Sequence, residues 1–433
     1  MGYKYVIYGA GIRGKRTLEL VGKENVIAFV DSAQEKIGTY YCGIQIINVF
    51  ELATIAEEYI CVITPALQAE MIGKKLHAQG INNCLYLNDD IDRMFMMNSL
   101  KILSALDKVK SVKKVAIYKV CLSSLVIYSH LEKLNCNPIL VLQEDDNENQ
   151  VEYLKRFFCV SDNSETAENC DAIIYTEPYI NNEFIRRIKN KVMLFNIKEM
   201  YEDALESAAE IKKYKHIHDG QRCFIVATGP SLRIADLEKL EANKEICISM
   251  NRIYNLFDSV QWRPNYYMIQ DTKMIEDLSE TIAELDLPIK FISGAVEKYW
   301  NNKQKANSVK FNFVNYVQMG NIPFFSDRVD KCVYEGMTVT YACLQMAVYM
   351  GFKEIYLLGL DHNYSKDVYS NQNHFVGYSA DKSIRLNKVY IEQNELAYIS
   401  AKRYAKEHGI QIYNATRGGK LEVFERVDFD SLF

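Results

Sequence analysis

CFIVATGPSL, at residues 223–232, indicates the fold of the larger part of this chain. An apolar, β-prone run leads into a Gly-Pro turn and Ser231, and a helix is predicted near Ile234–Leu240. A strand followed at once by a helix is the repeating unit of parallel α/β sheets. The turn between them lies at the carboxyl end of its strand, which is the edge where such sheets bind ligands.

The same alternation of strands and helices fills the rest of the chain. VIAFVD (26–31), KVMLFN (191–196) and EIYLLGLD (354–361) are typical of strands, and LNKVYIEQNELAYISAKRYAKEHG (386–409) is typical of a helix. We therefore expect an α/β fold with Rossmann-like parallel sheets in three consecutive blocks. The predicted parts are residues 1–90, a domain of nucleotide-binding type; 91–200, a second small α/β domain; 201–219, a polar, helix-prone connector; and 220–433, the catalytic domain.

Composition excludes several classes of protein. The 433 residues are 48% hydrophobic, enough for several cores, and 51 Lys and Arg against 56 Asp and Glu give a net charge of −5. An acidic chain is a poor partner for nucleic acid. The apolar runs are shorter than the roughly 18–20 residues of a membrane helix, so we expect a cytoplasmic protein, with peripheral membrane association left open. The 11 scattered cysteines include no CxxC pair, which argues against disulfides and structural zinc.

A glycine fingerprint stands near the start of the chain. Gly9, Gly11 and Gly14 follow an apolar strand and open a helix, and Asp31 ends the next strand, 20 residues after Gly11. This is the context of a loop that binds dinucleotide phosphates and ribose hydroxyls. The block is half the size of a dinucleotide fold, and no hydride-transfer residues follow it. Nucleotide binding and a purely structural role both remain open for this loop.

Polar residues follow several predicted strands of the last block. The loop Thr228, Gly229, Pro230, Ser231 would offer exposed backbone N–H groups to a phosphate, unless Ser231 is only a helix cap. Asn251, Asp271 and Asp361 end three further strands. In a parallel sheet these ends meet at one edge, so together they favour a binding site, although each one alone is typical of a cap or turn.

Two further polar stretches are candidates for chemistry. Residues 361–375 join a strand to a long helix and contain Tyr364, Tyr369 and His374; histidine is the commonest general base. After the last strand, Arg417 and Lys420 flank two glycines, an arrangement that suits either an anion nest or a plain surface turn.

Four segments of the last block carry a resemblance. CFIVATGPSL, ISMNRIYNLF, TVTYACLQMAVYMGFKEIYLLGLD and NHFVGYSADKS are similar, in this order, to bacterial CMP-sialic acid sialyltransferases. They look even more like a broad family described as 6-hydroxymethylpterin pyrophosphokinase-like, which includes glycosyltransferases of the motility-accessory-factor type. The resemblance covers roughly residues 220–420. In the first block, VDSAQEKIGTYYCGIQIINVFEL resembles the nucleotide-binding domain of bacterial sugar acyltransferases.

The sialyltransferase resemblance implies a role for each matching residue, within a GT-A-like or sialyltransferase-like nucleotide-binding fold. Residues 228–231 would bind the cytidine monophosphate of the donor, with Asn251 and Thr338 in the same pocket. His374 matches the general base, and Tyr364 and Tyr369 lie near the tyrosines that hold the leaving phosphate. Val339 and Thr340 replace the Ser-Gly of the family at the sialic-acid end of the pocket, which leaves two expectations open for the transferred sugar: a sialic-acid-like nonulosonate or a different sugar.

The implied activity is an inverting, metal-independent glycosyl transfer in cell-surface glycan biosynthesis. The donor is a nucleotide sugar, with CMP favoured, the acceptor is a hydroxyl of a glycan or protein, and no cofactor is required. A first alternative is ATP-dependent diphosphate transfer to a hydroxymethylpterin, with Mg²⁺ held by Asp271 and Asp361. A second is a non-catalytic protein that binds nucleotide sugars. The sequence leaves the oligomeric state open.

Overall fold

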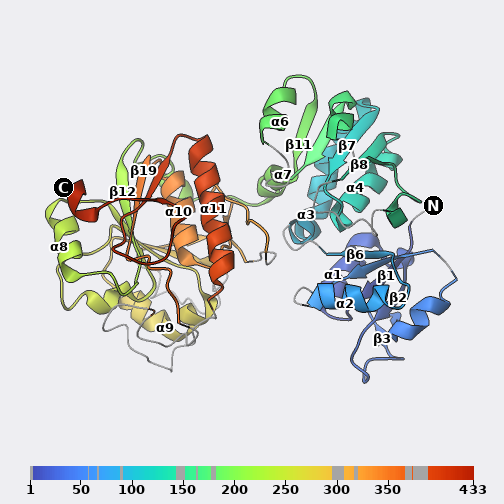
Figure 1. Cartoon of the computed structure of the whole chain (residues 1–433), viewed down its shortest axis with the longest axis horizontal. Coiled ribbons are helices and arrows are strands. Elements are labelled where there is room, and N and C mark those ends of the chain that lie inside the picture. Colours follow the sequence, from blue (N-terminus) through green and yellow to red (C-terminus); the bar gives the residue numbers. More distant parts are fainter. Residues whose placement is uncertain are drawn as a thin grey trace. The chain divides into compact units, whose positions relative to one another are not determined.

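The computed structural model describes residues 3–56, 58–65, 68–87, 91–142, 152–161, 164–176, 182–294, 307–315, 320–365, 373 and 389–433. Internal contacts divide the chain into two compact units, Met1–Ala204 and Leu205–Phe433. Three parallel sheets account for most of the strands, two in the first unit and one in the second (Figure 1). The expected α/β, Rossmann-like architecture is therefore confirmed, whereas the finer domain boundaries stay a prediction.

The first unit begins with a six-stranded sheet in the order β3-β4-β2-β1-β5-β6. Its pairs are parallel except β3 and β4, an antiparallel hairpin whose two turn residues, Cys42 and Gly43, have φ of 52° and 76°. Positive φ at both positions is what a tight hairpin turn requires. The elements are β1 (Tyr5–Tyr8), α1 (Ile12–Val21), β2 (Val26–Val30), β3 (Tyr40–Tyr41), β4 (Ile44–Ile47), β5 (Ile60–Ile63), α2 (Ala69–His77), β6 (Cys84–Tyr86) and α3 (Ile91–Leu106).

The second sheet of this unit has five parallel strands in the order β11-β10-β7-β8-β9. Helix α3 contacts α1 of the first sheet's block and α4 and α7 of the second, so it joins the two blocks within the unit. The elements are β7 (Lys114–Tyr118), α4 (Leu122–Lys133), β8 (Asn137–Val141), β9 (Val160–Ser161), β10 (Ala172–Tyr175), α6 (Asn182–Ile188), β11 (Met193–Asn196) and α7 (Ile197–Ala204).

The second unit is built on eight parallel strands in the order β16-β15-β14-β13-β12-β19-β20-β21, with a separate β17–β18 pair. From β12 the chain adds β13 to β16 on one side of this strand and then returns to add β19 on the other side. The order of the strands therefore reverses between β12 and β19, at a place that we call the switch point. The elements are β12 (Arg222–Val226), α8 (Ile234–Ala242), β13 (Cys247–Met250), β14 (Tyr266–Ile269), α9 (Thr272–Glu284), β15 (Ile289–Ser293), β16 (Ser308–Phe311), β17 (Phe313–Val314), β18 (Val333–Tyr334), α10 (Val339–Tyr349), β19 (Glu354–Leu358), α11 (Ile391–Glu407), β20 (Gln411–Asn414) and β21 (Glu425–Arg426).

Helices cover both faces of this sheet, and each face has its own hydrophobic core. On one face α10 and α11 lie side by side (Figure 1), and all eleven residues of α10 are buried because its sequence carries no charge. Ala397, Ala401 and Ala405 of α11 recur every four residues and are buried, which lets the helix approach closely. The other face is covered by α8, α9 and the C-terminal Phe429.

Local signals placed several boundaries correctly. The helix expected at Ile234–Leu240 is α8, and Gly351 and Gly409, which directly follow the C-cap residues of α10 and α11, have φ of 96° and 65°. The connector differs from expectation. Beyond α7 it forms a short 3-10 helix, Ile211–Tyr214, rather than an α-helix. Backbone hydrogen bonds from His216 and His218 to the carbonyl oxygens of Tyr349 and Met350 attach it to the end of α10.

No helix within the described residues combines the length and apolar character needed to cross a membrane.

Candidate functional site

Two predicted loops meet at the switch point of the large sheet, between β12 and β19. The loop after β12 contains Gly229 and Ser231, and the loop after β19 contains Gly359 and Asp361. The amide of Gly229 donates to the carbonyl oxygen of Gly359 at 2.8 Å. Asp361 Oδ2 accepts from both the amide (3.2 Å) and the hydroxyl (2.8 Å) of Ser231. In open α/β sheets this is the point where ligands bind.

Glycine at position 229 is required by this close approach. A Cβ placed there would lie 2.1 Å from Asp361 Oδ2 and 2.4 Å from the carbonyl oxygen of Gly359. Gly359 itself has φ of 67°, a conformation that favours glycine. The Gly-Pro-Ser turn is therefore shaped by packing against the β19 loop.

The expectation of exposed amides in this loop was wrong in one respect. The amides of Gly229, Ser231 and Leu232 all donate within the protein, and Pro230 has none to offer. Thr228 is buried, while Pro230 is exposed. The described conformation therefore offers side chains rather than a row of free amides. Burial raises the pKa of Asp361 although Ser231 hydrogen bonds oppose the shift.

The other predicted strand-end residues lie on the same edge of the sheet, since β12, β13, β14 and β19 are parallel. Asp271 caps α9 by accepting from the amide of Lys273 at 2.9 Å, and Thr338 caps α10 by accepting from the amide of Thr340 at 3.4 Å. Asn251 has φ of 52°, and its Oδ1 is buried without a hydrogen-bond partner among the described residues.

Sequence reasoning missed two polar residues at this edge, Gln270 and Glu335. Gln270 directly follows β14 and Glu335 directly follows β18; they are 8% and 9% exposed. Gln270 Nε2 donates to Glu335 Oε1 at 3.4 Å, and the amide of Met337 donates to the same oxygen at 2.7 Å. Burial, with a smaller contribution from the charge of Asp271, raises the pKa of Glu335 to about 7. The signal in the sequence was an acid directly before Gly336, at the start of a charge-free helix.

Of the three predicted catalytic residues, Tyr364 is described, whereas Tyr369 and His374 lie outside the described residues. Burial raises the pKa of Tyr364 to about 12, so its hydroxyl is a neutral donor at pH 7. Its ring centroid lies 5.9 Å from that of His362, whose side chain is 1% exposed and whose Nε2 is 3.4 Å from Glu395 Oε1. Burial lowers the pKa of His362.

The two basic residues after the last long strand differ in their surroundings. Arg417 donates to Asp236 Oδ1 and to Asp430 Oδ2, at 2.6 Å each, so its guanidinium is already engaged by two carboxylates. The side chain of Lys420 is exposed, and its amide donates to the carbonyl oxygen of Asp361 at 2.7 Å. The segment holds the β19 loop in place, and a phosphate contact would fall to Lys420 rather than to Arg417.

The glycine fingerprint of the first unit folds as expected in its backbone. A Cβ at Gly14 would lie 2.0 Å from the carbonyl oxygen of Gly9, and Gly11 precedes α1. Asp31 Oδ2 accepts from the amide of Ala10 at 3.0 Å and from Lys36 Nζ at 2.8 Å. These bonds hold the pKa of Asp31 below its ordinary value despite its partial burial. The acid that the fingerprint assigns to a ribose is thus engaged with its own loop.

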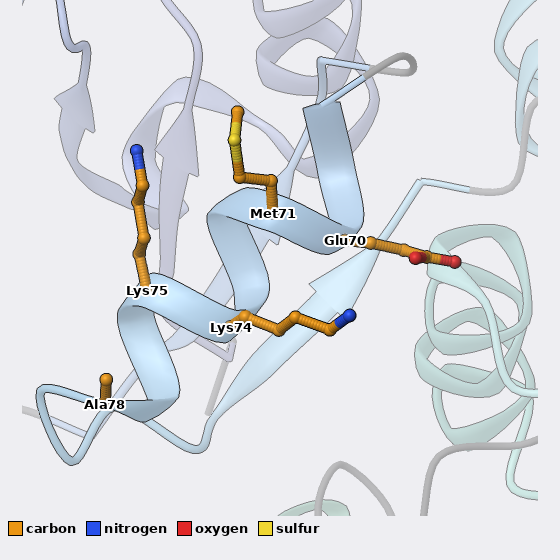
Figure 2. Close-up of a pocket in the computed structure, with 5 residues that line it drawn as sticks. All are labelled: Glu70, Met71, Lys74, Lys75 and Ala78. Carbon is orange, nitrogen blue, oxygen red and sulfur yellow. The ribbon is translucent and has the colours of Figure 1, made fainter.

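A hollow of about 560 Å³ lies beside α2 of the first unit, lined by Glu70, Met71, Lys74, Lys75 and Ala78. Figure 2 shows that all five come from one helix or its end, with Met71 and Lys75 pointing one way and Glu70 and Lys74 another. The hollow is open to solvent, and none of the predicted site residues lines it.

The described residues contain no group of three or more His, Cys, Asp or Glu placed to hold a metal ion. Asp271 and Asp361, the ligands considered for Mg²⁺, are instead engaged with the start of α9 and with Ser231.

Two parts of the chain match known protein families. Residues 191–367 match a family described as 6-hydroxymethylpterin diphosphokinase MptE-like, which confirms the expected resemblance, and the match ends before Tyr369 and His374. Residues 1–84 match a family described as C2185-like, N-terminal. No curated protein matches the chain. A MAf glycosyltransferase from Magnetospirillum magneticum AMB-1 is similar in structure, with 13% identity, 84% of this chain and 67% of that chain covered, and a TM-score of 0.36.

Proposed function

We propose that the second unit, which contains most of the matched residues 191–367, is a glycosyltransferase that uses a nucleotide sugar. One observation carries this proposal. Polar residues at the ends of β12, β13, β14 and β19 occupy one edge of a parallel sheet, at and beside the switch point between β12 and β19. Open α/β sheets bind nucleotides there. The order of the sequence motifs, which is similar to that of CMP-dependent sialyltransferases, favours CMP as the nucleotide.

The mechanism that we propose is a direct displacement. His374 accepts the proton of the acceptor hydroxyl as its oxygen forms a bond to the anomeric carbon of the sugar. The bond from that carbon to the phosphate oxygen breaks, and the nucleotide leaves with the electron pair, so the configuration inverts. Tyr364 and Tyr369 donate hydrogen bonds to the departing phosphate. The high pKa of Tyr364 supports this role, because the hydroxyl keeps its proton.

The His374→Ala variant tests this mechanism. Removal of a general base typically lowers the rate by about 10²–10⁴-fold. We therefore expect transfer to be lost while affinity for the nucleotide sugar, measured by calorimetry, is kept. Unchanged transfer in the variant would remove His374 from the mechanism.

A thermal-shift panel of CMP, UDP, GDP and ADP, and of the sugars linked to them, with and without Mg²⁺, tests the function itself. A ligand that binds only the folded state raises the melting temperature. We expect the largest rise with CMP and a CMP-linked sugar, and no dependence on Mg²⁺. A rise with none of these ligands would contradict the proposal.

The name of the matched family favours a second candidate, diphosphate transfer from ATP to a hydroxymethylpterin. Such chemistry needs Mg²⁺ bridging the ATP phosphates and protein oxygens. Stabilisation by ATP only when Mg²⁺ is present, together with product formation that a chelator abolishes, would favour this candidate. Stabilisation by a CMP-linked sugar in the presence of chelator would favour the glycosyltransferase.

A further inference from the structure

The pair formed by Gln270 and Glu335 is the feature of the sheet edge that folding explains least. Both side chains are more than nine-tenths buried. Gln270 Nε2 reaches Glu335 Oε1 only at 3.4 Å, and Gln270 Oε1 has no hydrogen-bond partner among the described residues. A buried polar atom left without a partner lowers the stability of the fold. Such an atom calls for an explanation, and a bound ligand that pairs with it is one.

A second unpaired oxygen lies at the adjacent strand end. Asn251 follows β13, which pairs with β14 in parallel register, and its Oδ1 is buried and unpartnered within the described residues. The backbone of Met337, two residues after Glu335, is strained, with φ of 59°, a conformation that a residue with a long side chain rarely adopts. Such strain is found at ligand-binding sites. The strands β13 and β14 are neighbours, about 4.8 Å apart. The unpaired oxygens of Asn251 and Gln270 therefore lie at the ends of adjacent strands on one edge of the sheet.

The chemistry of these atoms defines what they can bind. The unpaired atoms are amide oxygens, which only accept hydrogen bonds. Among the described residues, the groups that hydrogen-bond the Glu335 carboxyl are the Gln270 side chain and the backbone N–H groups of Gly336 and Met337. A carboxyl donates a hydrogen bond to a hydroxyl when it is protonated and accepts one when it is ionised. The matching ligand group is therefore a neutral hydroxyl rather than a phosphate.

On the other side of the switch point, after β20, the polar side chains of Asn414, Thr416 and Arg417 have hydrogen-bond partners. Beyond β20, Asn414 Oδ1 accepts from the amide of Thr416, Thr416 Oγ1 accepts from the amide of Leu360, and Arg417 is held by two carboxylates. The polar groups there are satisfied within the protein. A ligand anchored between β12 and β19 reaches the unpaired amide oxygens of Asn251 and Gln270 on the side of β13 and β14, the latter two strands or about 10 Å away.

We propose that Gln270 and Glu335, together with Asn251, form a subsite that binds hydroxyl groups of a sugar ring. The inference rests on the proposed function, in which the ligand is a nucleotide sugar. It carries two sugar rings, the ribose and the transferred sugar, and both present neighbouring hydroxyls.

Calorimetry on the full chain tests this subsite with CMP and CMP-sialic acid, each with chelator present. The variants are Gln270→Ala, Glu335→Ala and Glu335→Gln. The control is Glu354→Ala, because Glu354 begins β19 at the opposite edge of the same sheet and is exposed. Glu335→Gln keeps the shape of the side chain, so it remains informative if Glu335→Ala folds poorly. Melting temperatures without ligand separate lost binding from lost folding.

We expect Gln270→Ala and Glu335→Ala to weaken binding of CMP-sialic acid by about tenfold or more, and Glu335→Gln to weaken it less. Weakening of CMP-sialic acid alone assigns the subsite to the transferred sugar, and equal weakening of CMP assigns it to the ribose. Equal affinities in the control and all three variants would overturn the subsite. If the unaltered chain loses affinity in chelator and regains it with added Mg²⁺, and the Glu335 variants do not regain it, the subsite is overturned in favour of a cation site. Failure of the unaltered chain to bind either ligand would contradict the proposed function instead.

Discussion

At the scale of single residues, the loop after β12 depends on glycine at position 229, where there is no room for a Cβ atom. Gly229 lies against Asp361 and Gly359, two residues of a different loop, and backbone cannot yield as a flexible side chain does. For Gly229→Ala we expect a loss of roughly 1–3 kcal/mol in the free energy of unfolding of the second unit, as for other overpacked positions. Urea unfolding followed by fluorescence measures this loss.

Gly11→Ala is the matched control, because nothing lies within 4 Å of a Cβ at that position. Equal unfolding midpoints for Gly229→Ala and the unaltered chain would show that the two loops are not packed as described.

Glu335 makes stability depend on pH in a direction opposite to most carboxyls. Its pKa is near 4.5 when exposed and about 7 in the fold, because burial disfavours the charged form. Between these values the folded state binds more protons than the unfolded state, so stability falls as pH rises from about 4.5 to about 7. The fall amounts to roughly 3 kcal/mol at most.

Glu335→Gln removes this titration. Unfolding free energies measured from pH 5 to pH 8 are expected to fall less in this variant than in the unaltered chain. Parallel profiles for Glu335→Gln and the unaltered chain would mean that Glu335 titrates normally.

Residue-scale prediction from sequence worked where a residue directly ends a strand. Asn251, Asp271 and Asp361 were expected at one edge because parallel strands place their carboxyl ends together, and they lie there. Glu335 follows β18, a two-residue strand outside the main sheet, so periodicity gave no sign of it. The partners of Arg417 could not be predicted either, because Asp236 is far away in sequence and meets it only in the folded chain.

At the scale of elements, a buried lysine of β15 caps the C-terminal end of helix α9. Lys290 lies within β15 and is 1% exposed, and its Nζ donates to the carbonyl oxygens of Ile282, Ala283 and Leu285 at 3.1–3.2 Å. Ile282 and Ala283 belong to the last turn of α9 and Leu285 is its C-cap residue, and carbonyls at a helix end have no amide partner within the helix. The strand thus fixes the end of the helix that precedes it.

Lys290→Met keeps the volume of the side chain and removes the three bonds. We expect the variant to lose about 1–3 kcal/mol of stability, the cost of leaving buried carbonyls unpaired. Urea unfolding is the measurement, and Lys212→Met, at an exposed position, is the control. Equal losses in the two variants would show that the contacts of Lys290 with α9 contribute nothing specific.

The elements that sequence predicted are those with an unambiguous pattern. The apolar strands β2, β12 and β19 were placed to within a few residues, since parallel strands buried on both faces are continuously apolar. Strand β16 (SVKF) has no such run, and it is recognised only through its pairing with β15. The segment after α7 is polar, and its docking on α10 uses backbone atoms, which no side-chain pattern reports.

At the scale of the whole molecule, the second unit contains everything that the proposed site needs. Both cores that enclose the large sheet consist of residues from Ile211 onward. We expect residues 205–433, produced alone, to fold and to bind the same nucleotide sugar with the same affinity as the full chain, measured by calorimetry. A fragment that folds but does not bind would place part of the site in the first unit.

The most direct test of the central claim is nucleotide release by the full chain in the presence of EDTA, followed by chromatography. The account predicts that CMP appears from a CMP-linked sugar at the same rate with EDTA as with Mg²⁺. Release of no nucleotide from any nucleotide sugar, with Mg²⁺-dependent consumption of ATP in the presence of a hydroxymethylpterin, would contradict it.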